Sequence, residues 1–368
     1  MQEDINRFGF GFMRLPLKNN EIDIKKTNEM VDEFISQGGK LFDTAFQYHD
    51  EKSEDAIKKC VVERYPRDRF LIADKMPIYT MKPTEDPYEI FETQLERCGV
   101  SYFDYYLAHD PEDRYYEGLC KDLKIFDALN QFKKEGRIKR IGLSLHDTPE
   151  VLEKILIEHP EIEFVLLRIN YKDWNSSHVK SKECYEVCMK YNKSVWVMGA
   201  IKGGQLAKVN KKIDKLFKKH GDMSPALWAF SFVFNLDNIE MVLSGMSTLE
   251  EVKQNMVFIK NFEKSSHDLK ILNKARDLLS NSREIACTTC DYCKNHCPMD
   301  IPISKYFDLY NLNIKSIDLD CFSQYEELSE DFAKASDCID CGDCEETCPQ
   351  HLKISNELKK VVEVFELI

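Results

Sequence analysis

Residues 41–48 read Leu-Phe-Asp-Thr-Ala-Phe-Gln-Tyr, a short apolar run that gives way to polar side chains at its end. Similar runs recur along the chain and alternate with longer amphipathic stretches, such as residues 27–37, 122–135 and 249–260. This alternation is typical of repeated βα units around a parallel sheet. The eight runs cover residues 8–15, 40–45, 70–76, 105–109, 140–145, 164–170, 195–201 and 241–246. Eight strands predict an α/β fold, a closed (β/α)8 TIM barrel.

An open, doubly wound sheet is the alternative to a barrel. Such a sheet usually has fewer strands and a glycine-rich first turn, but no G-x-G-x-x-G follows any of the runs, so a Rossmann site is not supported. The strand pattern stops after a last helical stretch, residues 268–279. We therefore predict a barrel over residues 1–283 and a small, mostly α-helical domain over residues 284–368, with helical stretches at 303–312 and 325–335.

Two cysteine runs indicate the chemistry of the second domain. Each reads C-x2-C-x2-C-x3-C-P, the first over residues 287–298 and the second over residues 338–349. In such a run three thiolates bind one 4Fe-4S cluster, and the cysteine before the proline binds the other cluster. The spacing therefore predicts one cluster on Cys287, Cys290, Cys293 and Cys348, and a second on Cys338, Cys341, Cys344 and Cys297.

Zinc is the alternative ligand for a C-x2-C pair. Zinc sites close with four ligands in two pairs, however, and do not require the C-x3-C-P ending twice. The long segment between Cys297 and Cys338 resembles the α-helical ferredoxin modules attached to larger oxidoreductases, so we expect the clusters to relay single electrons. The other six of the fourteen cysteines are scattered, and Cys184 and Cys188, although spaced for one helix face, are interpreted as structural.

The formal charge of the chain is -13 and is unevenly distributed. Residues 286–368 carry seventeen Asp and Glu against seven Lys and Arg. Nucleic acid is a poor partner for such a surface. The acidic surface is either a solvated face or a docking surface for a basic redox partner protein. Because the N-terminus lacks a cationic and apolar leader and no window is apolar enough for a membrane span, we expect a cytoplasmic protein.

Polar residues also mark the ends of three early strands, where barrel enzymes build their active sites; they are Asp43, Tyr48, Lys75 and His109. Taken singly, they could be a packed aromatic, a buried ion pair and a hydrogen-bonded core histidine. Together they resemble the Asp, Tyr, Lys and His set of the aldo/keto reductases. The resemblance covers nearly the whole chain, including FGFGFMRLP at residues 8–16 and SGMSTLEEVKQN at residues 244–255.

The chemistry of carbonyl reduction explains this combination of residue types. Hydride addition leaves an alkoxide-like oxygen that needs a proton, and Tyr48 is the candidate proton donor. We expect the ammonium of Lys75 to lower the pKa of Tyr48, with Asp43 as the counter-ion of the lysine. His109 would orient the substrate oxygen or pass the proton.

The resemblance also implies a nicotinamide nucleotide site. Ser144 and Asn170 match positions near the nicotinamide carboxamide, Gly245 and Ser247 suit an anion at a helix start, and Asn255 matches the adenine contact. Glu251 stands near the position of the 2′-phosphate in NADP-dependent members, and a carboxylate there favours NAD over NADP. Two departures weaken the grip on nicotinamide, because the usual amide-holding glutamine is Leu166 and the stacking aromatic is Met198.

These observations predict an iron–sulfur oxidoreductase that reduces a small carbonyl or conjugated substrate with NAD(H). Hydride carries two electrons and each cluster passes one, so a flavin, a radical intermediate or a second site has to join them. One alternative is a reductase fed by the clusters without nicotinamide, with or without flavin. Another is a nucleotide-binding redox sensor or electron-transfer subunit.

Overall fold

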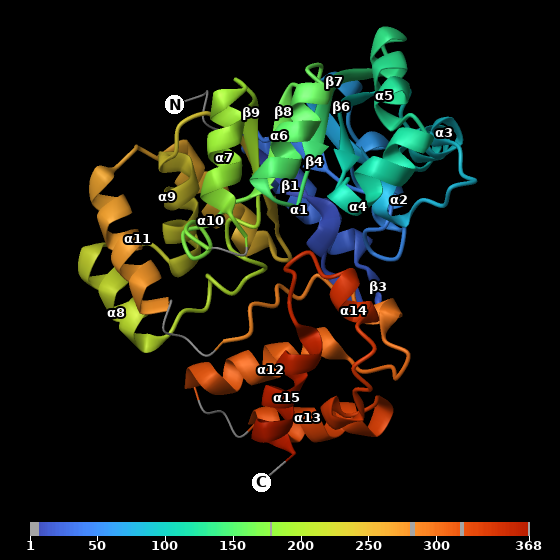
Figure 1. Cartoon of the computed structure of the whole chain (residues 1–368). Helices are drawn as coiled ribbons and strands as arrows, with labels where there is room; N and C mark the ends of the chain where they lie inside the picture. Colours follow the sequence, from blue (N-terminus) through green and yellow to red (C-terminus); the bar gives the residue numbers. More distant parts are fainter. Residues whose placement is uncertain (1–6, 177–178, 280–283, 317–319, 367–368) are drawn as a thin grey trace. The chain divides into compact units, whose positions relative to one another are not determined.

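The structure is a computed structural model that describes residues 7–176, 179–279, 284–316 and 320–366 (Figure 1). Eight parallel strands close into a barrel in the order β1, β10, β9, β8, β7, β6, β5, β4. The strands are β1 (Phe8–Gly11), β4 (Leu41–Asp43), β5 (Leu71–Met76), β6 (Phe103–His109), β7 (Ile138–Ser144), β8 (Phe164–Arg168), β9 (Ser194–Met198) and β10 (Ile239–Gly245). The predicted eight strands and the barrel are confirmed.

Apolar side chains form a core cluster of alternating strand residues, among them Leu41, Ala73 and Leu107. In the same cluster Phe164 stacks on Trp196 with ring centres 4.3 Å apart. Because side chains alternate between the two faces of a strand, the residues two positions beyond Leu41, Ala73 and Leu107 share their face. Those residues are Asp43, Lys75 and His109. Along these strands the inward-facing side chains therefore change from apolar in the core to polar at the C-terminal end.

One glycine makes this packing feasible. A Cβ atom at Gly142 of β7 would lie 2.4 Å from the ring of Phe164 and 2.8 Å from Leu107. Side chains in a close-packed core cannot yield that much without moving their neighbours. Gly142 therefore leaves the space that the Phe164 ring fills.

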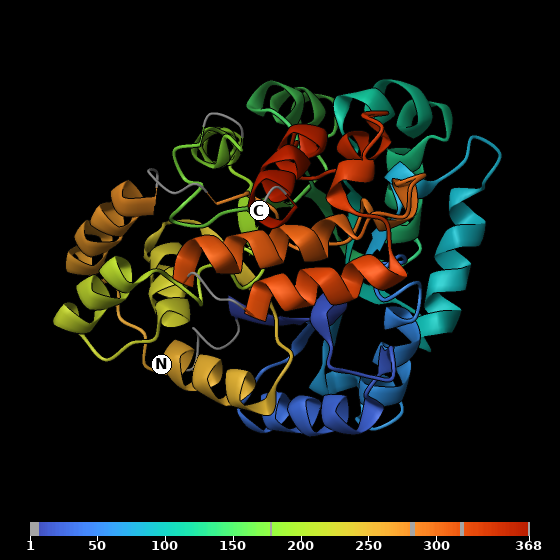
Figure 2. The same ribbon diagram turned by 90° about the horizontal axis from the view of Figure 1, so that it is seen from below.

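Helices follow the strands and cover them. In the first part of the chain they are α1 (Ile24–Ser36), α2 (Ser53–Ile57), α3 (Pro87–Cys98), α4 (Asp113–Tyr115), α5 (Ile125–Lys134), α6 (Pro149–Glu158), α7 (Ser181–Lys190) and α10 (Leu249–Lys260). Figure 2 shows α1 and α10 side by side. A short hairpin, β2 (Leu17–Lys18) with β3 (Glu21–Ile22), leads into α1. The rings of Phe34 on α1 and Phe42 on β4 meet edge to face with centres 5.3 Å apart.

Contacts between Cα atoms divide the chain into two compact units. The first comprises Met1–Ala200 and Ser231–Ser266, and the second comprises Ile201–Phe230 and His267–Ile368. The helices in the later part of the chain are α8 (Lys211–His220), α9 (Pro225–Asn235), α11 (Ser266–Leu279), α12 (Ile303–Ser316), α13 (Asp320–Asp331), α14 (Asp343–Glu346) and α15 (Ile354–Phe365). The predicted domain boundary, between residues 283 and 284, adjoins residues 280–283, which lie outside the described residues, and it stays a prediction.

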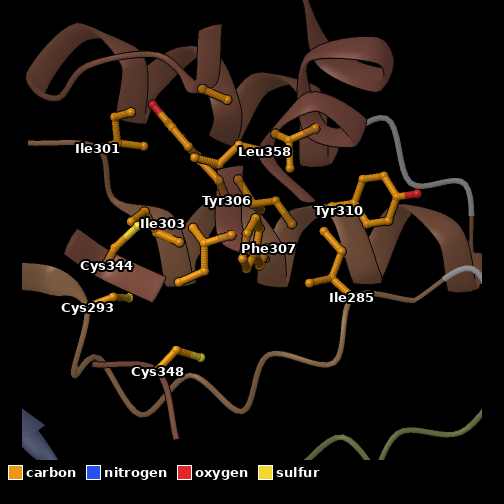
Figure 3. Close-up of a cluster of buried hydrophobic side chains, with 14 of the residues drawn as sticks. Ile285, Cys293, Ile301, Ile303, Tyr306, Phe307, Tyr310, Cys344, Cys348 and Leu358 are labelled. Carbon is orange, nitrogen blue, oxygen red and sulfur yellow. The ribbon is translucent and has the colours of Figure 1, made fainter. Parts of the chain in front are cut away.

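The C-terminal helices have an apolar core of their own. Figure 3 shows Tyr306 and Phe307 of α12 at its centre, with Leu358 of α15 nearby and Cys293, Cys344 and Cys348 at its edge. Tyr306 and Tyr325 have ring centres 4.4 Å apart, which joins α12 to α13. The prediction of a mostly helical region is confirmed. Of the helices in the described ranges, none is long and apolar enough to cross a membrane.

The second predicted helix of this region is misplaced in the sequence interpretation. Residues 325–335 were expected to be helical, whereas α13 runs from Asp320 to Asp331. The backbone N–H of Ala335 donates to the Tyr325 hydroxyl at 3.0 Å, and the Tyr306 hydroxyl donates to the carbonyl of Ala333 at 3.0 Å. These tyrosine contacts satisfy backbone groups outside the helix ladder, so the chain turns back over the core.

Candidate active site and cluster cavities

The four polar residues predicted at the early strand ends come together at one end of the barrel. Lys75 and Asp43 are buried, and the Lys75 Nζ atom donates to Asp43 Oδ1 at 2.6 Å and to the carbonyl oxygen of Thr44 at 2.5 Å. The same ammonium lies 5.1 Å from the centre of the Tyr48 ring. The Tyr48 ring meets His109 edge on, with centres 6.3 Å apart. The arrangement places a phenol and an imidazole above a buried ion pair.

The pKa of Tyr48 lies well above its ordinary value in the resting protein. Burial of the hydroxyl is the main cause, the charges of Asp43 and Asp74 add to it, and Arg14 opposes it. The prediction that Lys75 lowers this pKa is therefore wrong for the resting protein. The physical reason is that Asp43 pairs with the lysine and cancels much of its charge, while desolvation disfavours any phenolate. Tyr48 consequently holds its proton at neutral pH.

His109 is held as a neutral imidazole. Burial lowers its pKa well below the ordinary value, and the positive charge of Lys75 lowers it further. The Nδ1 atom lies 3.4 Å from Nε2 of Gln47, whose amide also donates to the hydroxyl of Tyr79. Because an amide N–H₂ only donates, Nδ1 accepts and the proton sits on Nε2.

Gln47 and Tyr79 are site residues that the sequence interpretation missed. Tyr79 follows β5 in a 3-10 turn (Ile78–Thr80), and its ring centre lies 5.2 Å from that of His109. Gln47 directly precedes Tyr48, and this adjacency was a usable signal because both belong to the loop after β4. Nothing in the sequence pointed to Tyr79.

A second polar network lies on the other face of β5. The carboxyl of Asp74 accepts from the Lys75 backbone N–H at 2.8 Å and from the Cys98 thiol at 3.7 Å. Gln94 donates its amide to Glu54 at 2.9 Å and to the Lys75 carbonyl at 3.0 Å. Burial raises the pKa of Asp74 well above its ordinary value, and the neighbouring Glu54 raises it further. Hydrogen bonds from this network fix the backbone N–H and carbonyl of Lys75.

The residues expected around the nicotinamide are present at the strand ends. Ser144 is buried and pairs in register with His109. The amide of Asn170 is already engaged, because it donates to Asp173 at 3.0 Å and to the Gly199 carbonyl at 3.3 Å. Leu166 is buried in the core cluster of the barrel, and Met198 is a partly buried side chain that packs against this cluster.

The start of α10 is closed by its own side chains. Glu251 accepts from the backbone N–H of Ser247 at 2.7 Å and of Thr248 at 3.3 Å, and Thr248 caps the helix in return. This capping box differs from the expected role of Glu251 at the ribose. The hydroxyl of Ser247 donates to the carbonyl of Arg14 at 2.8 Å, and Asn255 is buried on the inner face of α10.

Arg14 is another residue that sequence reasoning left without a role. A Cβ atom at Gly245 would lie 3.1 to 3.2 Å from the Arg14 side chain, so the arginine stem lies over the turn expected to bind phosphate. Arg14 also lowers the pKa of Tyr48. It is thus a cation between the phenol and the start of α10.

Eight cysteines in the second unit line two cavities. The first cavity is lined by Cys287, Cys290, Cys293 and Cys348, and the second by Cys297, Cys338, Cys341 and Cys344. The structure therefore brings together the two crossed sets that the spacing predicted. Ile303, the first residue of α12, lines both cavities, so the two lie next to each other.

The donor set fits two 4Fe-4S clusters. Burial, together with the charges of the other thiols of each set, raises the pKa of Cys287 and of Cys344 to about 12 each. Iron reverses this shift, because a thiol that binds a metal is deprotonated. Four soft sulfur ligands around an apolar-walled cavity are the usual ligation of a cubane cluster. Within the described residues, no three His, Cys, Asp or Glu side chains converge closely enough to bind a single metal ion.

These features define a class of protein, a barrel oxidoreductase with an Asp, Tyr, Lys and His set, joined to a helical domain with two four-cysteine cavities. The chain belongs to the aldo/keto reductase family, whose sequence profile matches residues 7–277. The profile of a 4Fe-4S dicluster domain matches residues 286–353. The resemblance noted in the sequence is therefore confirmed for both parts.

Relatives with known names are distant. A methylglyoxal reductase from Yersinia pestis is 23% identical over 200 residues, 52% of this chain and 65% of that protein. An aryl-alcohol dehydrogenase (NADP⁺) from Phanerodontia chrysosporium is 23% identical over 150 residues, 36% of this chain and 37% of that protein. The chain thus spans less than two thirds of the length of these relatives.

Solved structures share the barrel. An aldo-keto reductase from Klebsiella pneumoniae in complex with NADPH has a TM-score of 0.59 and 17% identity, over 73% of this chain and 90% of that chain. The holo form of one from Bacillus halodurans has a TM-score of 0.59 and 20% identity, over 73% and 91%. At these identities the likeness shows the fold.

Proposed function

We propose that the chain reduces a small carbonyl-containing or conjugated substrate at the C-terminal end of the barrel, with the two 4Fe-4S clusters as an electron relay. The observation that carries the proposal is the buried Lys75–Asp43 ion pair beside Tyr48, facing a neutral His109. A binding module without turnover has no need for this whole set. The family membership supports the reaction type.

Each of the four residues has a distinct role in this proposal. Tyr48 donates its proton to the substrate oxygen as negative charge develops there. Lys75 then stabilises the tyrosinate, while Asp43 and the Thr44 carbonyl fix the ammonium in place. Since Nδ1 of His109 faces Gln47, the Nε2–H is the donor that orients the substrate oxygen. Tyr79 packs against the imidazole and limits its rotation.

The electrons come from groups that the chain's residues are suited to hold. A bound nicotinamide supplies a hydride, and the clusters pass one electron at a time. A flavin, a radical intermediate or a second site has to join the two modes. We propose NAD(H) as the nucleotide, because Glu251 already takes the two N–H groups at the start of α10 that a 2′-phosphate would need. The alternative is NADP(H), because the name of one relative includes NADP⁺ and one similar structure was solved with NADPH.

A reductase fed by the clusters alone is the second candidate. It is favoured by the losses around the nicotinamide position, where Leu166 is buried in the core and the Asn170 amide is engaged by Asp173 and Gly199. In this version the acid and the ion pair keep their roles, and only the electron source differs. A redox sensor or electron-transfer subunit is the third candidate.

Anaerobic turnover of the cluster-loaded protein separates these candidates. We expect NADH to bind in a fluorescence titration and to drive reduction of a carbonyl substrate. Reduction that proceeds with dithionite but without any nucleotide binding would support the cluster-fed enzyme. Nucleotide binding without turnover of any carbonyl in a broad panel would contradict the proposed reaction and leave the sensor.

A further inference from the structure

The two cysteine cavities differ in the exposure of the residues that line them. Among the fourteen cysteines, all of which lie in described residues, Cys341 alone is exposed. Its cavity is also lined by Ile339 and Met299, whose side chains are 60% and 38% exposed. Cys344 of this cavity is buried, and none of the four described cysteines that line the other cavity is exposed. The second cavity therefore has an exposed thiol and an apolar rim, where residue types that normally avoid water are exposed.

Charge divides the two cavities in the same way. Residues 338–349, the second cysteine run, carry four carboxylates and no Lys or Arg, whereas residues 287–298, the first run, carry one Asp and one Lys. Asp340 lines the cavity and is exposed, with Lys359 at 4.0 Å, and Asp343 is also exposed. Glu345 is already paired, because it accepts from the Ser355 hydroxyl and lies 3.4 Å from the Lys353 ammonium. An apolar centre with an acidic edge thus surrounds the exposed thiol.

We infer that this surface, the Cys341 face (Met299, Ile339, Asp340, Cys341 and Asp343), docks a basic one-electron carrier protein. The inference rests on the proposed electron relay and specifies where electrons enter or leave it. Apolar residues at the centre of an interface exclude water, and carboxylates at the edge steer a positively charged partner into place. One electron then passes between the carrier and the cluster on Cys297, Cys338, Cys341 and Cys344, so that one is oxidised as the other is reduced, with no bond made or broken.

Cytochrome c, a small basic haem protein, is a suitable probe of this surface. The full cluster-loaded chain is reduced with dithionite, freed of excess reductant and mixed anaerobically with ferric cytochrome c, whose haem iron accepts the electron. We expect Asp340→Asn/Asp343→Asn to lower the second-order rate constant about tenfold at low salt, within the range of electrostatic steering. The difference should disappear at high ionic strength, where exposed charges are screened.

The matched control removes the same charge elsewhere in the second unit. Glu326→Gln/Glu330→Gln changes two exposed carboxylates of α13, which contributes no residue to either cavity. The control should keep the rate constant within about twofold of the parent protein, because these exposed charges border neither cavity and salt screens such charges with distance. An equal loss in both double variants, or a loss in neither, would overturn the inference.

A structural readout complements the rate. Carbodiimide links carboxylates to lysines in contact, and peptide mapping of the mixture should find links at Asp340 or Asp343. Links confined to α13 would also overturn the inference. No carbonyl substrate enters either experiment. Failure of docking with intact dithionite-driven carbonyl reduction would therefore leave the proposed function standing, and failure of carbonyl reduction would leave the docking result interpretable.

Discussion

Tyr48 keeps its proton in the resting protein because its surroundings disfavour another negative charge. The lysine beside it is best understood as a charge that becomes useful when the phenol gives up its proton. Removing the hydroxyl as Tyr48→Phe should lower kcat about 10²- to 10⁴-fold, the usual contribution of a general acid. Phenylalanine retains the edge contact with His109, so cluster content and the circular dichroism spectrum should not change. The measurement is anaerobic turnover of a carbonyl substrate with NADH.

Lys75→Met distinguishes a lysine that acts through the tyrosine from one that acts alone. Because Lys75 and Asp43 are both buried, the variant leaves an unpaired carboxylate and should lose about 3–5 kcal/mol of stability. Turnover should also fall, yet the double variant with Tyr48→Phe should be hardly slower than Tyr48→Phe alone, since residues that act as a unit are not additive. Fully additive losses would show that the two residues act independently.

Asp74 offers a pH-dependent test of the network behind Lys75. Burial and the neighbouring Glu54 raise its pKa, so the folded state binds this proton more tightly than the unfolded chain. The resulting stability is fully present below the unfolded pKa of about 4 and is lost as pH rises through the folded pKa. Asp74→Asn does not titrate, and it should unfold at higher urea than the parent protein at high pH, with the difference shrinking toward acid pH.

An exposed carboxylate on α12 provides the comparison for this prediction. Asp308→Asn removes the same charge from a residue that is exposed, and should shift the urea midpoint equally little at all pH values. A parent protein and Asp74→Asn variant with parallel pH profiles would mean that Asp74 is ionised in the folded state. Urea unfolding followed by tryptophan fluorescence is a suitable measurement, because Trp196 is buried in the barrel core.

At the scale of single elements, strands and the helix after the last strand could be predicted because their signals are local. The predicted stretch 249–260 coincides with α10, and each of the eight apolar runs overlaps a barrel strand. The end of α13 could not be predicted, because it depends on the hydroxyls of Tyr325 and Tyr306 reaching backbone groups from another part of the fold.

The candidate site divides along the same line. Asp43, Tyr48, Lys75 and His109 could be brought together from sequence, because strand alternation and the barrel topology fix which side chains share an end. The direction of the shift in the Tyr48 pKa could not be predicted from sequence, because it follows from burial and from the pairing of the lysine. The orientation of Glu251 was within reach, since a threonine three residues before a glutamate at a helix start is the capping-box pattern.

The closed start of α10 carries a prediction for nucleotide choice. Glu251→Gln removes the negative charge while retaining an acceptor for the Ser247 and Thr248 backbone, and Glu251→Arg also adds a cation. The ratio of the NADPH to the NADH dissociation constant should fall in the first variant and fall further in the second, because a 2′-phosphate no longer meets a carboxylate. Fluorescence titration measures both constants. An unchanged ratio in both variants would place the adenosine end of the nucleotide elsewhere.

At the scale of the whole molecule, the crossed cysteine sets predict which cluster is lost when a single cysteine is replaced. The parent protein should bind about eight iron atoms, and Cys297→Ser should reduce this to about four by removing the cluster held mainly by the second run. Electron paramagnetic resonance of the reduced protein should then retain the signal of the cluster on Cys287, Cys290, Cys293 and Cys348. Cys321→Ser is the control, because this buried cysteine lines neither cavity and should leave the iron content unchanged.

Loss of the cluster of the first run in Cys297→Ser would instead show that each run binds its own cluster. Crossed and uncrossed ligation predict a similar iron content for this variant. The spectra, which show which cluster remains, therefore have to be combined with the iron measurement. Variants of Cys348 provide the reciprocal case, because this residue lines the first cavity although it belongs to the second run.

The crossed sets also have a consequence for assembly. Each cluster ties residues near 290 to residues near 345, so either one alone closes the long loop that contains α12 and α13. The entropy lost in closing such a loop is spent once, and whichever cluster enters second meets ends that are already held together. Loading should therefore be cooperative. Under iron limitation a population of chains would divide into fully loaded and empty molecules, and few would carry half a relay.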